Sequence, residues 1–268
     1  MKKIIVTPAG RKKYLELLHT NLNKCKDEFD EWVIWVNTDN KEDIDYMESL
    51  ANSYDYIKLQ YSDVTVDPNG SHTATICRFF RNCIDENSVY LRLDDDIIYI
   101  KKGSIKDLFD FRIDNEEYFL VFGNILNNAI LTNLYQQKNI ITNLPPVSYD
   151  CLDENGWRNG HFATHLHSIF LEKESLGEES DFFIDNWILS NFERCSINAI
   201  SWLGKSFKEF NGEVGHAEEI WLSSDKPMEL NKPNIIFGKS IFSHYAFAPQ
   251  RPTLENTNIL ERYSKIIK

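Results

Sequence analysis

Three consecutive aspartates stand between two apolar segments of this chain. Residues 89–93 are typical of a buried β-strand, Asp94, Asp95 and Asp96 follow, and residues 97–100 are apolar again. Side chains alternate faces in an extended segment, so Asp94 and Asp96 are expected on one face and Asp95 on the other. Two carboxylates held side by side repel each other, and a divalent cation relieves that repulsion. The pattern predicts a site for Mg²⁺ or Mn²⁺, which prefer carboxylate oxygen.

An ordinary turn is the alternative explanation for the aspartates, because Asp side chains often bond to nearby backbone amides in turns. The flanking residues argue against it, since they are core-type residues instead of Gly, Ser or Pro. We therefore expect the triplet to form the floor of a pocket at the edge of a sheet.

Composition favours one folded domain over residues 1–268. A hydrophobic share of 42% supplies a sizeable core, and no low-complexity linker divides the chain. The formal net charge of −12 argues against nucleic acid as a partner. We expect a cytoplasmic protein, because the first residues indicate a strand instead of a signal peptide and no apolar stretch approaches the roughly 20 residues of a membrane span. Five dispersed cysteines indicate reduced thiols and no cysteine-based zinc site: Cys25, Cys77, Cys83, Cys151 and Cys195.

Strands and helices alternate in the first half of the chain. Strands are expected at 4–7, 31–37, 56–60 and 89–93, with helices at 12–25, 41–53 and 73–83 between them. This order predicts a doubly wound, mostly parallel α/β sheet. Ligands of such sheets bind beyond the carboxyl ends of the strands, where residues 7–11, 37–39 and 94–96 would converge. The sequence lacks the glycine motifs of dinucleotide oxidoreductases and P-loop NTPases.

The second half is less regular. Long loops are expected from 124 to about 160, where substrate-binding insertions often lie. The remaining expected elements are helices at 104–111, 164–172, 180–193 and 259–267, and strands at 118–123, 234–237 and 240–245.

Several motifs in order resemble the GT-A-fold glycosyltransferases, and are most similar to compact domains that build surface polysaccharides in bacteria and large DNA viruses. They are Thr7-Pro8-Ala9-Gly10-Arg11, Ile76-Cys77-Arg78-Phe79-Phe80-Arg81, Arg92-Leu93-Asp94-Asp95-Asp96 and Phe242-Ser243-His244-Tyr245. The resemblance implies a GT-A-like, mostly parallel twisted sheet flanked by helices, with a smaller acceptor-side region. Residues 1–123 would bind the nucleotide sugar, and 124–268 would bind the acceptor and complete the metal site.

The resemblance also implies roles for the acidic residues. Asp96 would be the principal metal ligand, Asp94 would reach the metal or the ribose, and Asp95 would reach the donor sugar or the metal through water. His244 matches the late histidine that often completes the metal site, although a lone histidine on a short strand is also commonly just packed.

Other residues would bind the donor. Thr7, Ala9 and Arg11 would line the base and ribose pocket, and Asn37 lies at the same expected sheet edge. Arg78 would lie near the base or the diphosphate, since its planar fork suits phosphate or carbonyl groups. The diphosphate would also be met by Tyr245 and Arg251.

The general base is expected at Glu219. The segment Gly215-His216-Ala217-Glu218-Glu219 resembles the family's x-E-D element, whose last acid deprotonates the acceptor in inverting members. Glutamate stands here where aspartate is usual, so Glu218 remains an alternative, and favourable charge at a helix N-terminus is a simpler explanation of both. If the enzyme retains configuration, Asp185 becomes a candidate.

Three further features have competing interpretations. His161 and His165 share a helical face and have a spacing that can bind zinc, but packing or contact with the acceptor is favoured. Trp157 and Trp202 could stack on an acceptor sugar or be buried in the core. The basic residues of the last helix, including Arg262, could contact an anionic membrane surface or simply be solvated.

The sequence thus predicts a metal-dependent, inverting glycosyltransferase using Mn²⁺ or Mg²⁺. Its donor would be a nucleotide-diphosphate sugar, UDP-linked by resemblance, and its acceptor a glycan or lipid-linked glycan. A cation-dependent nucleotidyltransferase and a non-catalytic glycan-binding protein remain as alternatives.

Overall fold

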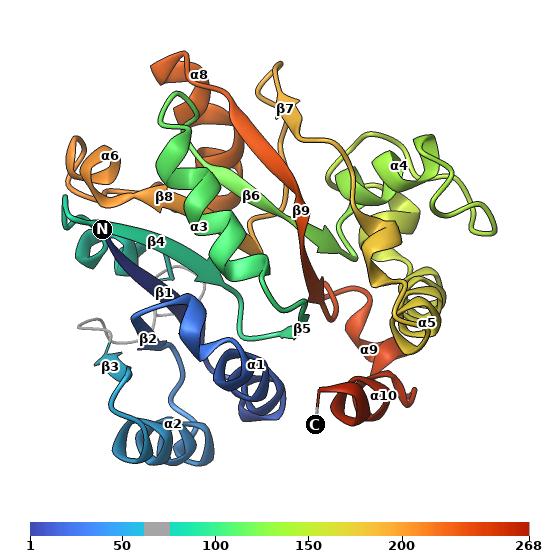
Figure 1. Ribbon diagram of the computed structural model, residues 1–268, viewed down its shortest axis with the longest axis horizontal. Coiled ribbons are helices and arrows are strands. Elements are labelled where there is room, and N and C mark those ends of the chain that lie inside the picture. Colours follow the sequence, from blue (N-terminus) through green and yellow to red (C-terminus); the bar gives the residue numbers. More distant parts are fainter. Residues whose placement is uncertain (62–75, 268) are drawn as a thin grey trace.

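The computed structural model describes residues 1–61 and 76–267. Their strands form one twisted sheet (Figure 1). Its strands in chain order are β1 (Lys2–Ala9), β2 (Glu31–Val36), β3 (Ile57–Tyr61), β4 (Ser88–Leu93), β5 (Ile97–Ile100), β6 (Val121–Leu126), β7 (Trp187–Leu189), β8 (Ala199–Leu203) and β9 (Asn234–His244).

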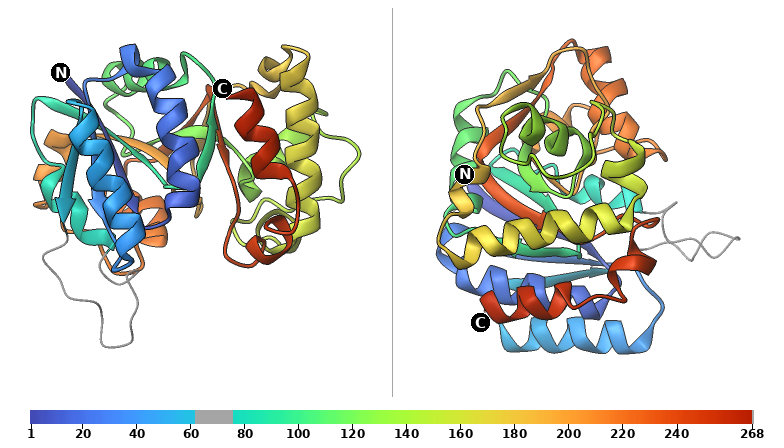
Figure 2. Two further views of the ribbon diagram at one scale, coloured as in Figure 1. Left: turned by 90° about the horizontal axis from the view of Figure 1, so that it is seen from below. Right: turned by 90° about the vertical axis from the view of Figure 1, so that its right-hand side faces the viewer.

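The order of strands in the sheet is β3-β2-β1-β4-β8-β6-β9-β5, with β7 also paired to β9. The first four strands are mutually parallel, and β6 is parallel to β9. The strand β8 joins the two halves of the sheet by pairing antiparallel with both β4 and β6. The expected fold class is confirmed: a mixed α/β fold with a curled sheet flanked by helices (Figure 2).

Helices flank the sheet (Figure 2). They are α1 (Lys12–Lys24), α2 (Lys41–Ser53), α3 (Ser104–Asp114), α4 (Ala129–Gln137), α5 (Gly160–Ser175), α6 (Gly204–Lys208), α7 (Glu218–Ile220), α8 (Lys226–Leu230), α9 (Arg251–Leu254) and α10 (Ile259–Ile266). Shorter 3₁₀ or π turns are η1 (Lys26–Glu28), η3 (Ile76–Asn82), η4 (Glu154–Arg158), η5 (Glu179–Phe182) and η6 (Trp221–Asp225).

Local sequence explains the regular first half. In α1, Leu15, Leu18 and Leu22 recur at helical spacing and are all buried. The helix α2 begins after Asn40, whose side chain accepts hydrogen bonds from the backbone N–H groups of Glu42 and Asp43. The expected helix at 73–83 lies partly outside the described residues, and its described part is the 3₁₀ turn η3.

The second half departs from the expected elements in several places, and the central strand β8 was not expected at all. The predicted helix at 180–193 is wrong: after the short turn η5, residues 187–189 form β7, because their backbone groups pair with the edge of β9. Two expected strands at 234–237 and 240–245 form the single strand β9, with an irregularity opposite Gly123–Ile125. The expected loops of 124–160 contain α4 and η4.

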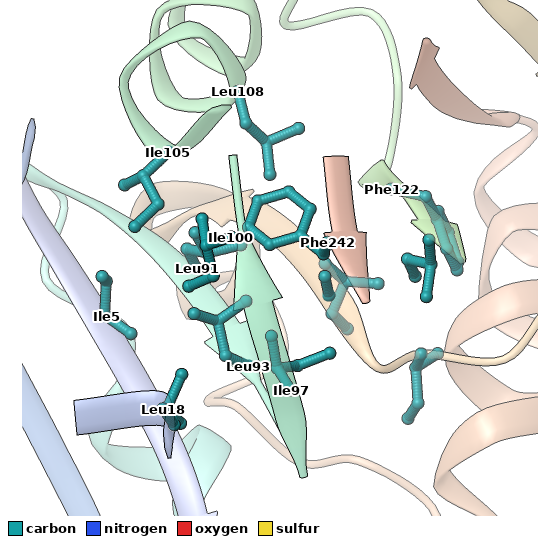
Figure 3. Packing of buried hydrophobic residues seen from close by; sticks show 14 of the residues in the cluster. Ile5, Leu18, Leu91, Leu93, Ile97, Ile100, Ile105, Leu108, Phe122 and Phe242 are labelled. Atoms are coloured by element: carbon teal, nitrogen blue, oxygen red, sulfur yellow. The ribbon is translucent and has the colours of Figure 1, made fainter. Parts of the chain in front are cut away.

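The core lies between the sheet and its helices. The helix α3 packs on β4, β6, β8 and β9, and Figure 3 shows Ile105 and Leu108 of α3 close to Leu91, Ile100 and Phe242. All five of these side chains are buried. In the part of the chain that the structure describes, no helix is long and apolar enough to cross a membrane.

We predict that Phe242→Ala destabilises the fold by about 3–5 kcal/mol, because it leaves a cavity under α3. The Phe242 ring is 0% exposed and lies against Gly123. Urea unfolding measures the change, with Leu176→Ala as the control because Leu176 is 66% exposed. A loss below about 1 kcal/mol for Phe242→Ala would contradict the packing described here.

Candidate active site

The aspartate triplet forms the turn that joins β4 to β5. The Asp94 amide donates to the Asn198 carbonyl at 3.0 Å, and the Ile97 amide donates to the Asp94 carbonyl at 3.1 Å. Asp95 and Asp96 are only 4% and 2% exposed. The backbone of this turn is therefore fixed by neighbouring elements, and its carboxylates are held in place instead of moving freely in solvent.

Asp94, Asp96 and His244 form a group that could hold a metal ion, since one ligand atom from each lies within 4.8 Å of the others. His244 ends β9, directly opposite Ile97 in the sheet, and its Nε2 lies 3.5 Å from Asp96 Oδ1. Two carboxylates and one imidazole suit Mn²⁺ or Mg²⁺. The structure thus brings together the three residues expected to bind the metal, and leaves Asp95 outside the group.

Two arginines lie against the buried carboxylates. The Arg11 guanidinium pairs with Asp95 and lies 3.1 Å from Asp96 Oδ2, and Arg251 Nη2 donates to the same Asp96 oxygen at 3.1 Å. Burial disfavours the charged form of Asp96, but Arg11, His244 and Arg251 outweigh it and hold its pKa below the ordinary value. Asp96 therefore remains an ionised ligand at neutral pH.

A third arginine, Arg92, links the aspartates to one of the two glutamates. Its Nε donates to Asp94 Oδ1 at 3.0 Å, and its Nη1 lies 3.0 Å from Glu218 Oε1. Glu218 Oε2 is buried and has no hydrogen-bond partner among the residues that the structure describes. Burial raises the pKa of Glu218 despite the nearby Arg92. Glu218 is thus a buried carboxyl with one free oxygen beside the metal-binding group.

Glu219 has a different environment. Its Oε1 accepts from Arg194 Nε at 2.8 Å and lies 2.6 Å from Arg194 Nη2. Glu218 likewise has one oxygen against an arginine, Arg92, so this contact does not separate the two glutamates. Glu218 differs in sharing its arginine with Asp94 and in having its second oxygen buried without a hydrogen-bond partner among the described residues. The sequence favours Glu219 as the base with Glu218 as the alternative, and both line the same cavity.

Two cavities meet at the aspartates. Both are lined by Arg11, Arg92 and Asp94, which form the wall between them. The first, of about 250 Å³, is also lined by Asp96, Ile197, Asn198, Glu218, Glu219, His244, Ala246, Phe247, Ala248 and Arg251. The second, of about 360 Å³, lies at the ends of β1 and β2 and is also lined by Pro8, Ala9, Gly10, Asn37, Thr38, Ile76 and Asp95.

Some expected binding residues do not line these cavities. The Thr7 hydroxyl is buried and accepts from the Trp32 indole at 3.0 Å, so it faces the core while Pro8, Ala9 and Gly10 face the cavity. Tyr245 is 0% exposed and its ring packs on Tyr14. Neither cavity lining includes Arg78 among the described residues, although its neighbour Ile76 is present.

The competing candidates lie elsewhere. Asp185 is exposed and pairs with Lys138 at 2.7 Å. His161 and His165 are exposed on α5, and no third ligand joins them among the described residues. Trp202 is 0% exposed in the core. Arg262 of α10 donates to Ser168 Oγ at 2.9 Å, so this basic residue is bound to α5.

Sequence reasoning missed three residues at the site: Arg92, Arg194 and Asn198. Asn198 Nδ2 donates to Asp94 Oδ2 at 2.9 Å. Only Arg92 carried a signal, because a charge inside an apolar strand requires a buried partner. Arg194 and Asn198 lie in a segment without regular structure, where no periodicity indicates direction.

No protein-family model matches this chain, and no curated protein sequence matches it. Among solved structures, the chain is similar to CMP:2-keto-3-deoxy-manno-octonic acid synthetase complexed with CTP over 99% of both chains, with a TM-score of 0.51 and 10% identity. It also matches 4-diphosphocytidyl-2C-methyl-D-erythritol synthase over 46% of this chain and 60% of that one, with a TM-score of 0.36 and 13% identity. The first likeness supports the expected fold, and neither supports the resemblance to glycosyltransferases in particular.

Proposed function

We propose that this chain is a divalent-cation-dependent transferase that takes its group from a nucleotide-linked phosphate donor. The observation that carries the proposal is the group of Asp94, Asp96 and His244 within 4.8 Å, at the carboxyl end of a parallel strand. Mn²⁺ or Mg²⁺ held by these three residues would supply positive charge against the donor phosphates. Arg11 and Arg251 lie beside Asp96 and would bind phosphate oxygens.

The two cavities suggest where each part of the donor and acceptor would bind. The cavity at the ends of β1 and β2, lined by Ala9 and Asn37, would take the nucleoside. The cavity lined by Glu218 and Phe247 would take the transferred group and the acceptor. Asp94 lies on the wall between them, where the donor phosphates would cross.

Glycosyl transfer is the reaction that the position of Glu218 favours. The free Glu218 Oε2 would accept the proton of an acceptor hydroxyl as that oxygen forms its bond to the anomeric carbon. The bond between this carbon and the donor phosphate oxygen breaks, and the nucleoside diphosphate leaves with the electron pair. Within this proposal the donor is a UDP-sugar and the acceptor a glycan or a lipid-linked glycan.

Nucleotidyl transfer is the second candidate, and the likeness to the synthetase complexed with CTP favours it over glycosyl transfer. In that reaction an oxygen of the sugar attacks the α-phosphorus of a nucleoside triphosphate, and pyrophosphate leaves. Such an enzyme is expected to have a glycine- and lysine-rich loop after its first strand, and this chain has only Gly10, Arg11 and Lys12–Lys13 there.

Identifying the leaving group decides between the two reactions. The protein with Mn²⁺ is incubated with nucleotide sugars and glycan acceptors, or with nucleoside triphosphates and free sugars, and phosphorus NMR identifies the product. Release of a nucleoside diphosphate together with a longer glycan supports glycosyl transfer, whereas release of pyrophosphate supports nucleotidyl transfer. Glycan binding with neither product would contradict both and would support the non-catalytic alternative.

We predict that the rate of the proposed reaction falls at low pH with an apparent pKa above about 4.3, the ordinary value for glutamate. Burial raises the Glu218 pKa, and a base must be deprotonated to act, so activity is lost as pH falls through that raised value. A profile of kcat against pH measures it. If the acidic limb lies at the ordinary value and persists in Glu218→Gln, Glu218 is not the base.

A further inference from the structure

Arg92 lies between a metal-binding carboxylate and the proposed base. On one side its Nε and Nη2 lie 3.0 and 2.9 Å from Asp94 Oδ1, and on the other its Nη1 lies 3.0 Å from Glu218 Oε1. Asp94 directly follows β4, and Glu218 begins α7. Two residues more than a hundred positions apart in the sequence therefore contact the same guanidinium.

Arg92 lines both cavities, but its burial and its two carboxylate partners leave little of its side chain for a ligand. Its side chain is 4% exposed, and its guanidinium carbon lies 5.8 Å from the centre of the Phe79 ring. Its charge is balanced by the two carboxylates. Arg251 is more accessible, since its side chain lines the cavity of about 250 Å³ and is 28% exposed. The contacts of Arg92 with Asp94 and Glu218 are therefore the route by which we expect it to affect the reaction.

The geometry of this bridge fixes which oxygens remain free. Asp94 Oδ2 accepts from Asn198, so Asp94 is held from two sides. Glu218 Oε1 forms an ion pair with Arg92 Nη1 at 3.0 Å, and Glu218 Oε2 has no hydrogen-bond partner among the described residues. A planar guanidinium can serve two carboxylates at once in fixed directions, whereas a lysine ammonium is a point charge on a flexible stem.

We propose that Arg92 is a positioning residue that sets the distance between the proton acceptor Glu218 and the metal-binding group at Asp94. This inference rests on the proposed role of Glu218. Arg92 also offsets the repulsion between these two carboxylates, whose side chains are 20% and 13% exposed and which would otherwise move apart. This role explains why an arginine stands at position 92 in the buried strand β4, where an apolar residue would otherwise be expected.

The test is a cycle of four proteins: wild type, Arg92→Met, Glu218→Gln and the double variant. We expect Arg92→Met to lower kcat about 100-fold, because a misplacement of about 1 Å has that effect on an oriented reaction. In the Glu218→Gln background the same change should lower kcat less than about 3-fold, since the group that it positions is already gone. Equal losses in the two backgrounds would overturn the proposal.

A second cycle on the same variants measures thermal stability and does not depend on detecting activity. Arg92→Met leaves Asp94 without this partner in both backgrounds, but it leaves the Glu218 carboxylate unpaired only in the wild-type background. It should therefore lower the melting temperature more in the wild-type background than with Glu218→Gln. Arg112→Met is the matched control: Arg112 is equally buried but donates to backbone carbonyls, including that of Tyr118 at 2.8 Å, and should show no such dependence on Glu218. Equal melting shifts for Arg92→Met in both backgrounds would overturn the inference.

Arg92→Lys keeps the test decisive if Arg92→Met does not fold. We expect it to fold, to bind nucleotide with Mn²⁺ within about 10-fold of wild type, and to lose kcat, since charge is kept and direction is lost. Unchanged kcat would overturn the positioning role. If wild type and Glu218→Gln have the same kcat, the proposed function of Glu218 fails instead, and the melting cycle still reports whether Arg92 and Glu218 are coupled.

Discussion

Asp96→Asn is expected to abolish cation-dependent nucleotide binding, with a loss of affinity of more than about 100-fold. Removing only an outer-shell partner of a metal ligand costs about 10–100-fold, and Asp96 lies inside the group with Asp94 and His244. The change also leaves Arg11 and Arg251 without the carboxylate that they share. Isothermal titration with a nucleotide, at fixed Mn²⁺ and without it, measures the effect.

Asp85→Asn is the matched control for this experiment. Asp85 precedes β4 at the end of the strand opposite the aspartates, where its Oδ2 accepts from Ser88 at 2.6 Å. The Asp85→Asn substitution removes the same charge near the other end of β4, and Asp85 lines neither cavity in the described chain. If Asp96→Asn bound the nucleotide as tightly as Asp85→Asn in the presence of Mn²⁺, the assignment of Asp96 as a metal ligand would be wrong.

Glu218→Gln is expected to lower kcat by about 10²–10⁴-fold while leaving the fold at least as stable as wild type. The pKa of Glu218 is raised by burial in the folded protein, so its ionisation disfavours the folded state at pH values above that pKa. Glutamine has nearly the same shape and carries no charge, so the cost of ionising a carboxyl at this site is removed. Its side chain can still contact Arg92, and Asp94 remains as the counter-charge of Arg92. Steady-state kinetics and thermal unfolding at pH 7 measure the two effects.

Glu219→Gln separates the two neighbouring glutamates. Because Glu219 does not share an arginine with a metal-binding carboxylate, as Glu218 does, we expect this variant to lose less activity than Glu218→Gln. Glu213→Gln serves as a surface control, since the side chain of Glu213 is 57% exposed and pairs with Arg81. A larger loss for Glu219→Gln than for Glu218→Gln would restore the order expected from the sequence.

The first half of the fold could be predicted because its signals are local. Strands such as 31–36 and helices such as 12–24 carry their own apolar periodicity, and parallel βαβ order brings their carboxyl ends together. The strand β7 could not be predicted in this way. Its three residues are extended because the edge of β9 pairs with them, and that contact spans about fifty positions of sequence.

The same distinction applies to the site. Asp94 and Asp96 follow from the alternation of side chains along a strand, and His244 from its place in a motif resemblance. The partners that fix these residues could not be found locally, because Asn198 and Arg194 approach from a segment whose direction is set by packing alone. The choice between Glu218 and Glu219 likewise depends on which one meets Arg92, a contact that neighbouring sequence does not encode.

Melting temperature with nucleotides, each with and without Mn²⁺, tests the central claim most directly, because a ligand that binds only the folded state raises it by mass action. UDP, CDP, GDP and CTP should all be compared, since both proposed reactions require a nucleotide whose phosphates meet the cation. At about 100 times Kd the expected stabilisation is about 2.7 kcal/mol, a shift of a few degrees. A shift for one base that appears only with Mn²⁺ is the predicted result. No shift with any nucleotide, or an equal shift without the cation, would contradict the proposal that Asp94, Asp96 and His244 hold a metal against nucleotide phosphates.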